Sequence, residues 1–209
     1  MRKFNGNCCR TMIYWKKLFV SKLVYHSEDW GIEMDIETKR LVIRDIRAED
    51  APVFAEMAQD GTLCEIGFDK DCGRWIQEWV TEAMGLASRE ILDSEYLAYT
   101  VVLKEDNSVV GSVGCSWYED MGKIGVTYFI GSEYRNRGYA SEALQAYIRY
   151  FFNRYEVSEL IATVNENNIP SLKVIEKTGF RLTGRNLYRD LNDEKEKMYC
   201  FYEMKHDIR

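Results

Sequence analysis

Two arginines and a glycine stand between a strand pattern and a helix pattern in "FIGSEYRNRGYASEALQAY", residues 129–147. At a helix start, the first N–H groups lack intrahelical partners and the helix dipole is positive, so an anion binds there readily. Gly138 permits a close backbone approach that a side chain would block, while Arg135 and Arg137 can donate charge-assisted hydrogen bonds. The segment therefore predicts a phosphate site, although a glycine turn flanked by solvated arginines fits the same short pattern.

A second strand-to-helix join occurs further along, in "VNENNIPSLKVIEKTGF", residues 164–180. Polar side chains gather at this join, among them Asn168 and Ser171. Two such joins can lie side by side at the open end of neighbouring parallel strands, where α/β folds bind ligands. Taken alone, Asn168 and Ser171 also fit a simple helix cap and turn. The chain around these joins lacks the glycine patterns of P-loop and dinucleotide folds, which disfavours those nucleotide-binding classes.

The elements that position these joins follow from periodicity. The helix over 139–153 is the clearest, because its apolar residues recur at i, i+3, i+4 and i+7. A second helix over 73–87 carries one apolar stripe: Trp75, Ile76, Trp79, Val80, Ala83, Met84 and Ala87. The remaining predictions are strands at 39–46, 123–130 and 159–164, two β-rich runs within 96–117 joined at Asp106-Asn107, helices at 50–60 and 170–180, and two closing strands within 180–204. This order indicates an α/β fold with a mixed sheet.

Composition narrows the class of protein. The chain has 209 residues, enough for one domain with a substantial core, and its net charge is −6. Residues 35–209 hold 22 Lys/Arg against 31 Asp/Glu, and this acidic balance argues against nucleic acid as the main partner. Six cysteines without a CxxC pair and only two histidines make a zinc site implausible and fit a reduced, cytoplasmic thiol set.

The first 33 residues show neither a helical nor a strand period. Lysines interrupt their apolar run well short of the ~20 residues that a membrane span needs, so neither secretion nor a span is expected. We therefore expect residues 1–33 to be a leader or an appended arm, and residues 34–209 to be a single domain.

The two joins together, with the strand between them, resemble the coenzyme A-binding half of the GCN5-related N-acetyltransferase (GNAT) family. The segment "IETKRLVIRDIRAEDA" resembles the ribosomal-protein N-terminal acetyltransferase branch of that family, and the resemblance covers roughly residues 36–204. It implies a mixed, mostly antiparallel central sheet flanked by helices, with splayed fourth and fifth strands. In this chain those strands are residues 123–130 and 159–164.

The resemblance also implies a binding site for acetyl-CoA, with no metal required. The loop that holds the pyrophosphate in the family corresponds here to Arg135, Arg137, Gly138, Tyr139 and Ala140. The pantetheine arm is expected to bond to the fourth strand through backbone groups and to be supported from the second join. The residues implied for this role are Tyr128, Phe129, Ile130 and Asn168.

Only some of the catalytic residues implied by the resemblance have a match in this chain. Many family members use a tyrosine in the helix after the fifth strand to protonate the departing thiolate, but the matching residue here is Ile175. The ribosomal branch instead places a serine at the start of that helix, which makes Ser171 the candidate acid. The general base stays open, because strand 123–130 contains no carboxylate; Glu119 and Asp120 are nearby alternatives to a water chain.

The expected activity is acetyl transfer from acetyl-CoA to a primary amine by direct attack in a ternary complex. The acceptor is a protein N-terminal α-amine or a small-molecule amine, with no nucleic acid or membrane partner, and the enzyme is a monomer or homodimer. Two alternatives remain: a non-catalytic module that binds or senses coenzyme A, and a scaffold that binds no nucleotide.

Overall fold

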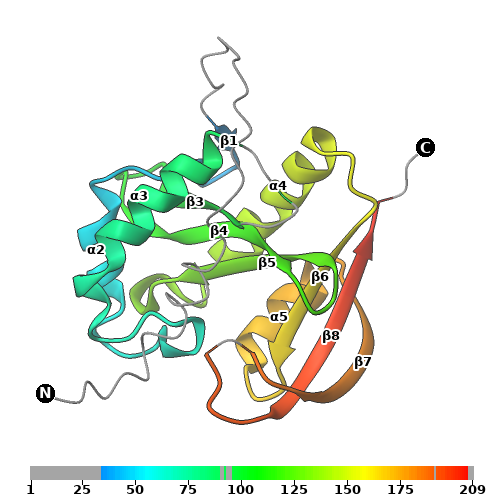
Figure 1. Cartoon of the computed structure of the whole chain (residues 1–209). Coiled ribbons are helices and arrows are strands. Elements are labelled where there is room, and N and C mark those ends of the chain that lie inside the picture. The colour runs from blue at the N-terminus through cyan, green and yellow to red at the C-terminus, as the bar shows by residue number, and fades with distance from the viewer. Residues whose placement is uncertain (1–33, 90–91, 93–95, 191, 207–209) are drawn as a thin grey trace, which may run out of the picture.

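The computed structural model describes residues 34–89, 92, 96–190 and 192–206 (Figure 1). The expected arm over residues 1–33 lies outside this range, and the domain boundary at residue 34 stays a prediction. The described strands form one sheet in the order β1-β2-β3-β4-β5-β6-β8-β7. Its pairings are antiparallel except for β5 with β6, so the predicted mixed, mostly antiparallel α/β fold is confirmed.

The bounds of the elements follow the sequence pattern closely. The strands are β1 (Asp35–Glu37), β2 (Leu41–Asp45), β3 (Tyr96–Leu103), β4 (Val109–Tyr118), β5 (Lys123–Ile130), β6 (Glu159–Asn165), β7 (Arg181–Tyr188) and β8 (Lys197–Lys205). The helices are α2 (Asp50–Met57), α3 (Ile76–Ala87), α4 (Tyr139–Arg154) and α5 (Ile169–Lys177), with short 3₁₀ turns at Cys64–Ile66, Cys72–Arg74 and Ser132–Tyr134.

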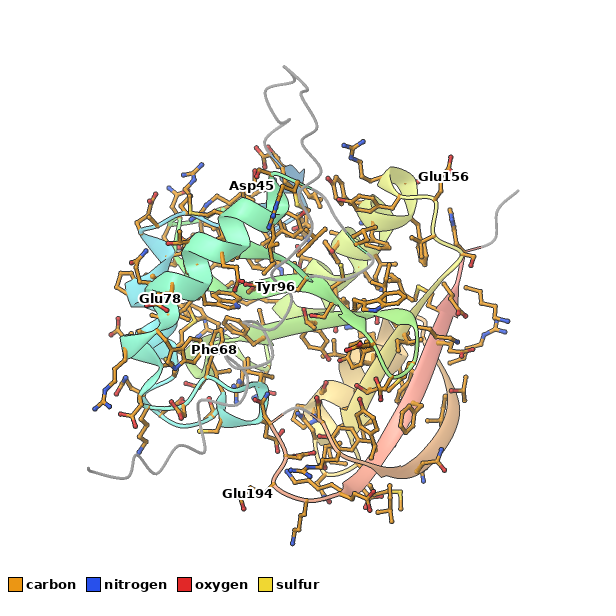
Figure 2. All side chains as sticks on the ribbon, in the orientation of Figure 1. Asp45, Phe68, Glu78, Tyr96, Glu156 and Glu194 are labelled. Carbon is orange, nitrogen blue, oxygen red and sulfur yellow. The ribbon has the colours of Figure 1, made fainter. Side chains whose placement is uncertain are left out.

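Helices cover both faces of the sheet. Helices α4 and α5 share one core with β2 to β6, whereas α2 and α3 pack on the opposite face in a second core (Figure 1). Aromatic rings fill the second core: Phe68 lies 5.2 Å from Trp79 and 5.2 Å from Phe129, between ring centroids. Figure 2 shows Phe68 and Tyr96 on this side of the sheet. Trp75 and Trp79, both in the predicted apolar stripe, pack against this core as partly buried residues.

The apolar stripe of α3 was predicted correctly except at one edge. Ile76, Val80 and Ala83 are buried, but Met84 is 42% exposed, whereas Leu86, which lies outside the predicted stripe, is only 3% exposed. Met84 and Leu86 lie at opposite edges of the same helical face, so a small rotation of the helix decides which one is covered. That rotation is set by packing against α2 and β3 rather than by the helical period.

The parallel strands β5 and β6 diverge almost at once. They pair only at Gly125 and Ile161, and Figure 1 shows the two strands then leading away from each other. We call the separation between Val126–Ile130 of β5 and Ala162–Asn165 of β6 the β5–β6 split. It is the splay predicted for the fourth and fifth strands of the resembling family, which are β5 and β6 in this structure.

Candidate active site

The loop between β5 and α4 ends in backbone conformations suited to an anion. Gly138 has φ +81° and Asn136 φ +62°, both left-handed, and Gly138 is the N-cap of α4. The first intrahelical bond runs from Glu142 N–H to Gly138 O at 3.1 Å. The N–H groups of Tyr139 and Ala140 therefore belong to the open first turn of a 16-residue helix, where the dipole favours negative charge.

The two arginines of this loop differ in what they contact. Arg135 donates from Nε to Ile130 O at 3.0 Å and from Nη2 to Thr62 Oγ1 at 2.9 Å, so its guanidinium ties the end of β5 to the loop after α2. The exposed side chain of Arg137 makes no such contact among the described residues, and only its carbonyl oxygen is engaged. Arg137 is thus the arginine whose charge is available to a ligand.

An arginine from outside the motif fixes the same loop. Arg40 donates from Nη1 to Arg137 O at 2.9 Å and from Nε to Glu142 Oε2 at 2.7 Å, and its guanidinium lies 4.6 Å from the centroid of the Tyr139 ring. Thr38 donates to Glu142 Oε1 at 2.7 Å. Burial raises the pKa of Glu142, but the hydrogen bonds from Thr38 and Arg40 outweigh it and hold that pKa below its usual value.

Sequence reasoning gave Arg40, Thr38 and Glu142 no role. The segment "ETKRL", which contains Thr38 and Arg40, carried part of the family resemblance. Their shared partner Glu142, however, lies 102 residues away from Arg40. The β1–β2 connection therefore braces the anion loop through an ion pair that only the folded chain brings together.

Successive backbone N–H and C=O groups of β5 point alternately toward β4 and toward β6. Gly131 N–H donates to Val110 O at 2.9 Å, and a Cβ placed on Gly111 would meet Phe129 O at 2.0 Å, so Phe129 directs its carbonyl toward β4. Because successive peptide groups of a strand point to opposite edges, Tyr128 and Ile130 direct theirs toward the split. Of the three residues predicted to bond the pantetheine arm through backbone, Phe129 is therefore turned toward β4 and away from the split.

The second join forms the other side of the split. Asn168 is the N-cap of α5 and accepts a hydrogen bond from Ser171 N–H at 3.2 Å on Oδ1. Its amide Nδ2 donates to Glu65 Oε2 at 3.1 Å. The capping role considered for Asn168 is thus present, and it leaves the Ser171 hydroxyl in the first turn of α5. That hydroxyl lies 2.7 Å from the Tyr128 hydroxyl of β5.

Two further side chains near the split, Ile175 and Tyr118, are held by packing. Ile175 is 1% exposed and belongs to the core beneath the sheet, so the usual tyrosine position is filled by packing. Tyr118 lies against Gly125, where an added Cβ would meet its ring at 2.3 Å, and its hydroxyl accepts from Thr163 at 3.4 Å. Burial raises the pKa of Tyr118 to about 12, with the charges of Asp190 and Asp120 adding to the shift. The charge of Asp120 therefore acts on this tyrosine, whose hydroxyl bonds to Thr163 of β6.

No cluster of three or more His, Cys, Asp or Glu side chains in the described part of the chain is arranged to hold a metal ion. No helix within those residues is long and apolar enough to cross a membrane.

The contrast between the two arginines gives a test of the loop. Since the family resemblance implies that this loop holds the pyrophosphate of coenzyme A, we expect Arg137→Ala to weaken coenzyme A binding about 10- to 100-fold, the loss expected for hydrogen bonds to a charged group, without lowering the melting temperature. Arg135→Ala will lower both the coenzyme A affinity and the melting temperature, because it removes the hydrogen bonds to Ile130 O and Thr62 Oγ1. Calorimetry and thermal denaturation measure both quantities, and Arg149→Ala, an exposed arginine further along α4, is the control. Lost affinity at an unchanged melting temperature in Arg135→Ala would contradict the bracing role.

Comparisons with known proteins agree with this geometry. The family model described as acetyltransferase (GNAT) domain matches residues 40–181, a range that includes both joins. The chain is 31% identical over 158 residues to YnaD, an uncharacterized N-acetyltransferase of Bacillus subtilis (strain 168). The aligned residues cover 72% of this chain and 85% of YnaD.

Solved structures show the same fold. A GNAT-family acetyltransferase from Bacillus anthracis superposes with a TM-score of 0.69 at 24% identity, covering 82% of this chain and 98% of the other. RimL, a ribosomal L7/L12 alpha-N-protein acetyltransferase in complex with coenzyme A, gives a TM-score of 0.71 at 15% identity, covering 84% of this chain and 100% of the other. With the family model, the relative and the splayed β5–β6 pair in agreement, this chain belongs to the GNAT family of N-acetyltransferases.

Proposed function

We propose that the protein transfers the acetyl group of acetyl-CoA to a primary amine, either a protein N-terminal α-amine or a small-molecule amine, by direct attack in a ternary complex. The observation that carries the proposal is the pair of helix N-termini flanking the β5–β6 split. One presents a glycine-capped anion loop and the other presents the Ser171 hydroxyl. Family membership supports the reaction class, and this geometry supports the roles of individual residues.

The residues at the first join suit the pyrophosphate of coenzyme A. A Cβ on Gly138 would lie 3.4 Å from Arg40 Nη2, so the absence of a side chain at Gly138 keeps the approach to the helix N-terminus open. The N–H groups of Tyr139 and Ala140 and the Arg137 side chain would hold the phosphates. Arg135 would act by holding the loop in place.

The pantetheine arm would enter the split, where Tyr128 and Ile130 direct backbone groups that β6 does not pair. Asn168, which orders the first turn of α5, would support the arm from the other side. A β5 backbone N–H aimed at the thioester carbonyl would stabilise the oxyanion that develops during attack. Acetyl-CoA supplies an activated acetyl group, and the thiolate of coenzyme A is a good leaving group.

In the chemical step, the amine nitrogen forms a bond to the acetyl carbon, and the C–S bond then breaks with its electron pair moving to sulfur. The nitrogen loses one proton to solvent. The Ser171 hydroxyl would hydrogen-bond or protonate the departing sulfur. An α-amine, with an ordinary pKa of ~7.7–8.0, needs much less help from a base than a lysine at ~10.4, which fits a strand β5 without carboxylates.

An α-amine acceptor has a second line of support, because RimL, which shares the fold, is an alpha-N-protein acetyltransferase. The direct test is thiol release from acetyl-CoA in the presence of peptides with free N-termini, polyamines and aminoglycosides. Turnover with one class identifies the acceptor. Coenzyme A binding without turnover on any amine would favour the non-catalytic module instead, and no binding at all would favour a scaffold.

Ser171→Ala will lower kcat by about 10- to 100-fold, at or below the lower end of the ~10²–10⁴-fold typical of acid catalysis, because a serine hydroxyl offers the thiolate little more than a hydrogen bond. The affinity for acetyl-CoA will change little. Ser88→Ala, at an exposed serine at the end of α3, is the matched control and will leave kcat unchanged. If Ser171→Ala lowers only the melting temperature, by the loss of the Tyr128 bond, then solvent is the proton source and the catalytic role is wrong.

A further inference from the structure

A tyrosine on one side of the β5–β6 split meets the candidate acid on the other. The Tyr128 hydroxyl, carried by β5, lies 2.7 Å from Ser171 Oγ and 3.3 Å from Ser171 O. Ser171 belongs to the first turn of α5, which follows β6. The two hydroxyls therefore face each other where the strands have separated.

We infer that Tyr128 is a positioning residue for the acetyl-transfer step, in which its hydroxyl donates to Ser171 Oγ and so turns the hydroxyl hydrogen of Ser171 toward the departing sulfur. This inference rests on the proposed function. It assigns the Tyr128 side chain a role separate from that of its backbone, which would bond the pantetheine arm.

The direction of this hydrogen bond follows from the chemistry of the two groups. A phenol is a much stronger acid than an aliphatic alcohol, so the tyrosine is the better donor of the pair. The Tyr128 hydroxyl has a single hydrogen, and Ser171 Oγ at 2.7 Å is the nearer of its two acceptors, whereas Ser171 O lies at 3.3 Å. Burial raises the pKa of Tyr128 to about 12, and its bond to Ser171 opposes that rise only in part, so the phenol keeps its proton at neutral pH.

The remaining groups of Ser171 are already engaged. Its N–H donates to Asn168 Oδ1 at 3.2 Å, which fixes the backbone of this turn. A serine hydroxyl has one hydrogen and two lone pairs. Once one lone pair accepts from Tyr128, the single hydrogen is left for another acceptor, and the leaving sulfur of a thioester bound in the split would be that acceptor.

The step needs no additional reactant. The C–S bond breaks with its electron pair on sulfur, and the Ser171 hydrogen stabilises that charge through a hydrogen bond. Tyr128 and Ser171 both keep their protons over the cycle, while the proton lost by the amine goes to solvent. The contribution of Tyr128 is therefore orientation of one hydrogen, which predicts an effect smaller than that of removing Ser171 itself.

The test is Tyr128→Phe, which removes one oxygen and keeps the ring that packs against the core shared with α4 and α5. We expect kcat to fall about 3- to 10-fold, with KM for acetyl-CoA and coenzyme A affinity unchanged. The double variant Tyr128→Phe/Ser171→Ala will be no slower than Ser171→Ala alone, because Tyr128 acts only through Ser171. The matched control is Tyr202→Phe, since the Tyr202 hydroxyl also donates to a side chain of α5, Glu176 Oε1 at 2.9 Å.

Wild-type kcat in Tyr128→Phe would overturn the inference, and so would a double variant slower than Ser171→Ala by the full Tyr128→Phe factor. A fall in kcat equal to that of Tyr202→Phe would also overturn it, because that would be a general effect of loosening α5. These outcomes leave the acetyltransferase assignment intact. Failure of the wild-type protein to release thiol with any amine would refute the proposed function instead, and this inference with it.

Discussion

Gly138→Val will weaken coenzyme A binding by about 3 kcal/mol or more, roughly 100-fold. Gly138 has φ +81°, a conformation that strains a β-branched residue by about 1–3 kcal/mol. Relief of that strain would turn the first N–H groups of α4 away from their common direction. The added side chain would also block the approach of phosphates to the N–H groups of Tyr139 and Ala140. Calorimetry with coenzyme A measures the loss.

The chain provides a control with the same backbone strain. Gly122 has φ +60° in the connection between β4 and β5, and among the described residues no atom beyond its chain neighbours lies within 4 Å of an added Cβ there. Gly122→Val will therefore lower the melting temperature while leaving coenzyme A affinity near that of wild type. Equal losses of affinity in both variants would mean that strain, rather than a blocked phosphate site, explains Gly138→Val. Wild-type affinity in Gly138→Val would remove this loop from the binding site.

Asp50→Ala will destabilise the fold by about 3–5 kcal/mol, the usual cost of removing one partner of a buried ion pair. The Asp50 carboxylate is 1% exposed and makes two bonds of 2.8 Å to the Arg44 guanidinium. It also accepts from Thr100 Oγ1 at 2.7 Å and from Arg47 N–H at 2.9 Å. Alanine leaves a largely buried arginine and a buried hydroxyl without their partner. Denaturant unfolding at neutral pH measures the loss.

The same carboxylate predicts a pH dependence. Burial raises the pKa of Asp50, but hydrogen bonds from Arg44, Thr100 and Arg47 outweigh it, so the pKa in the folded protein lies below the usual value. Asp50 therefore contributes its full stability above the unfolded pKa of ~3.9 and loses it as the pH falls toward the folded pKa. The difference in unfolding free energy between wild type and Asp50→Ala will stay constant from pH 7 to 5 and shrink below about pH 4.

Glu49→Ala is the neighbouring control for Asp50. Glu49 is exposed and makes no side-chain capping bond to α2, so its loss will change stability by less than about 0.5 kcal/mol. Similar effects of the two substitutions would show that the acidic pair acts through the dipole of α2 and not through the Arg44 network.

Local pattern by itself determined the elements of this protein and the positions of its two joins. Strand β5 occupies the predicted residues 123–130, α4 extends only one residue beyond the predicted 139–153, and α5 has Pro170 in its first turn. These features depend on periodicity, caps and turn residues a few positions apart, which a single sequence displays directly. The same local motifs, in order, were enough to indicate the GNAT family.

Only the tertiary structure shows which groups the side chains at the joins contact. Arg135, expected at the phosphates, is held by Ile130 O and Thr62, whereas Arg40 braces the loop from 97 residues before Arg137. Tyr128 and Ser171 are 43 residues apart and meet only because β5 and β6 are parallel neighbours that separate beyond Gly125. Such contacts depend on the order of the strands in the sheet and on small rotations of packed elements. Neither can be read from local periodicity.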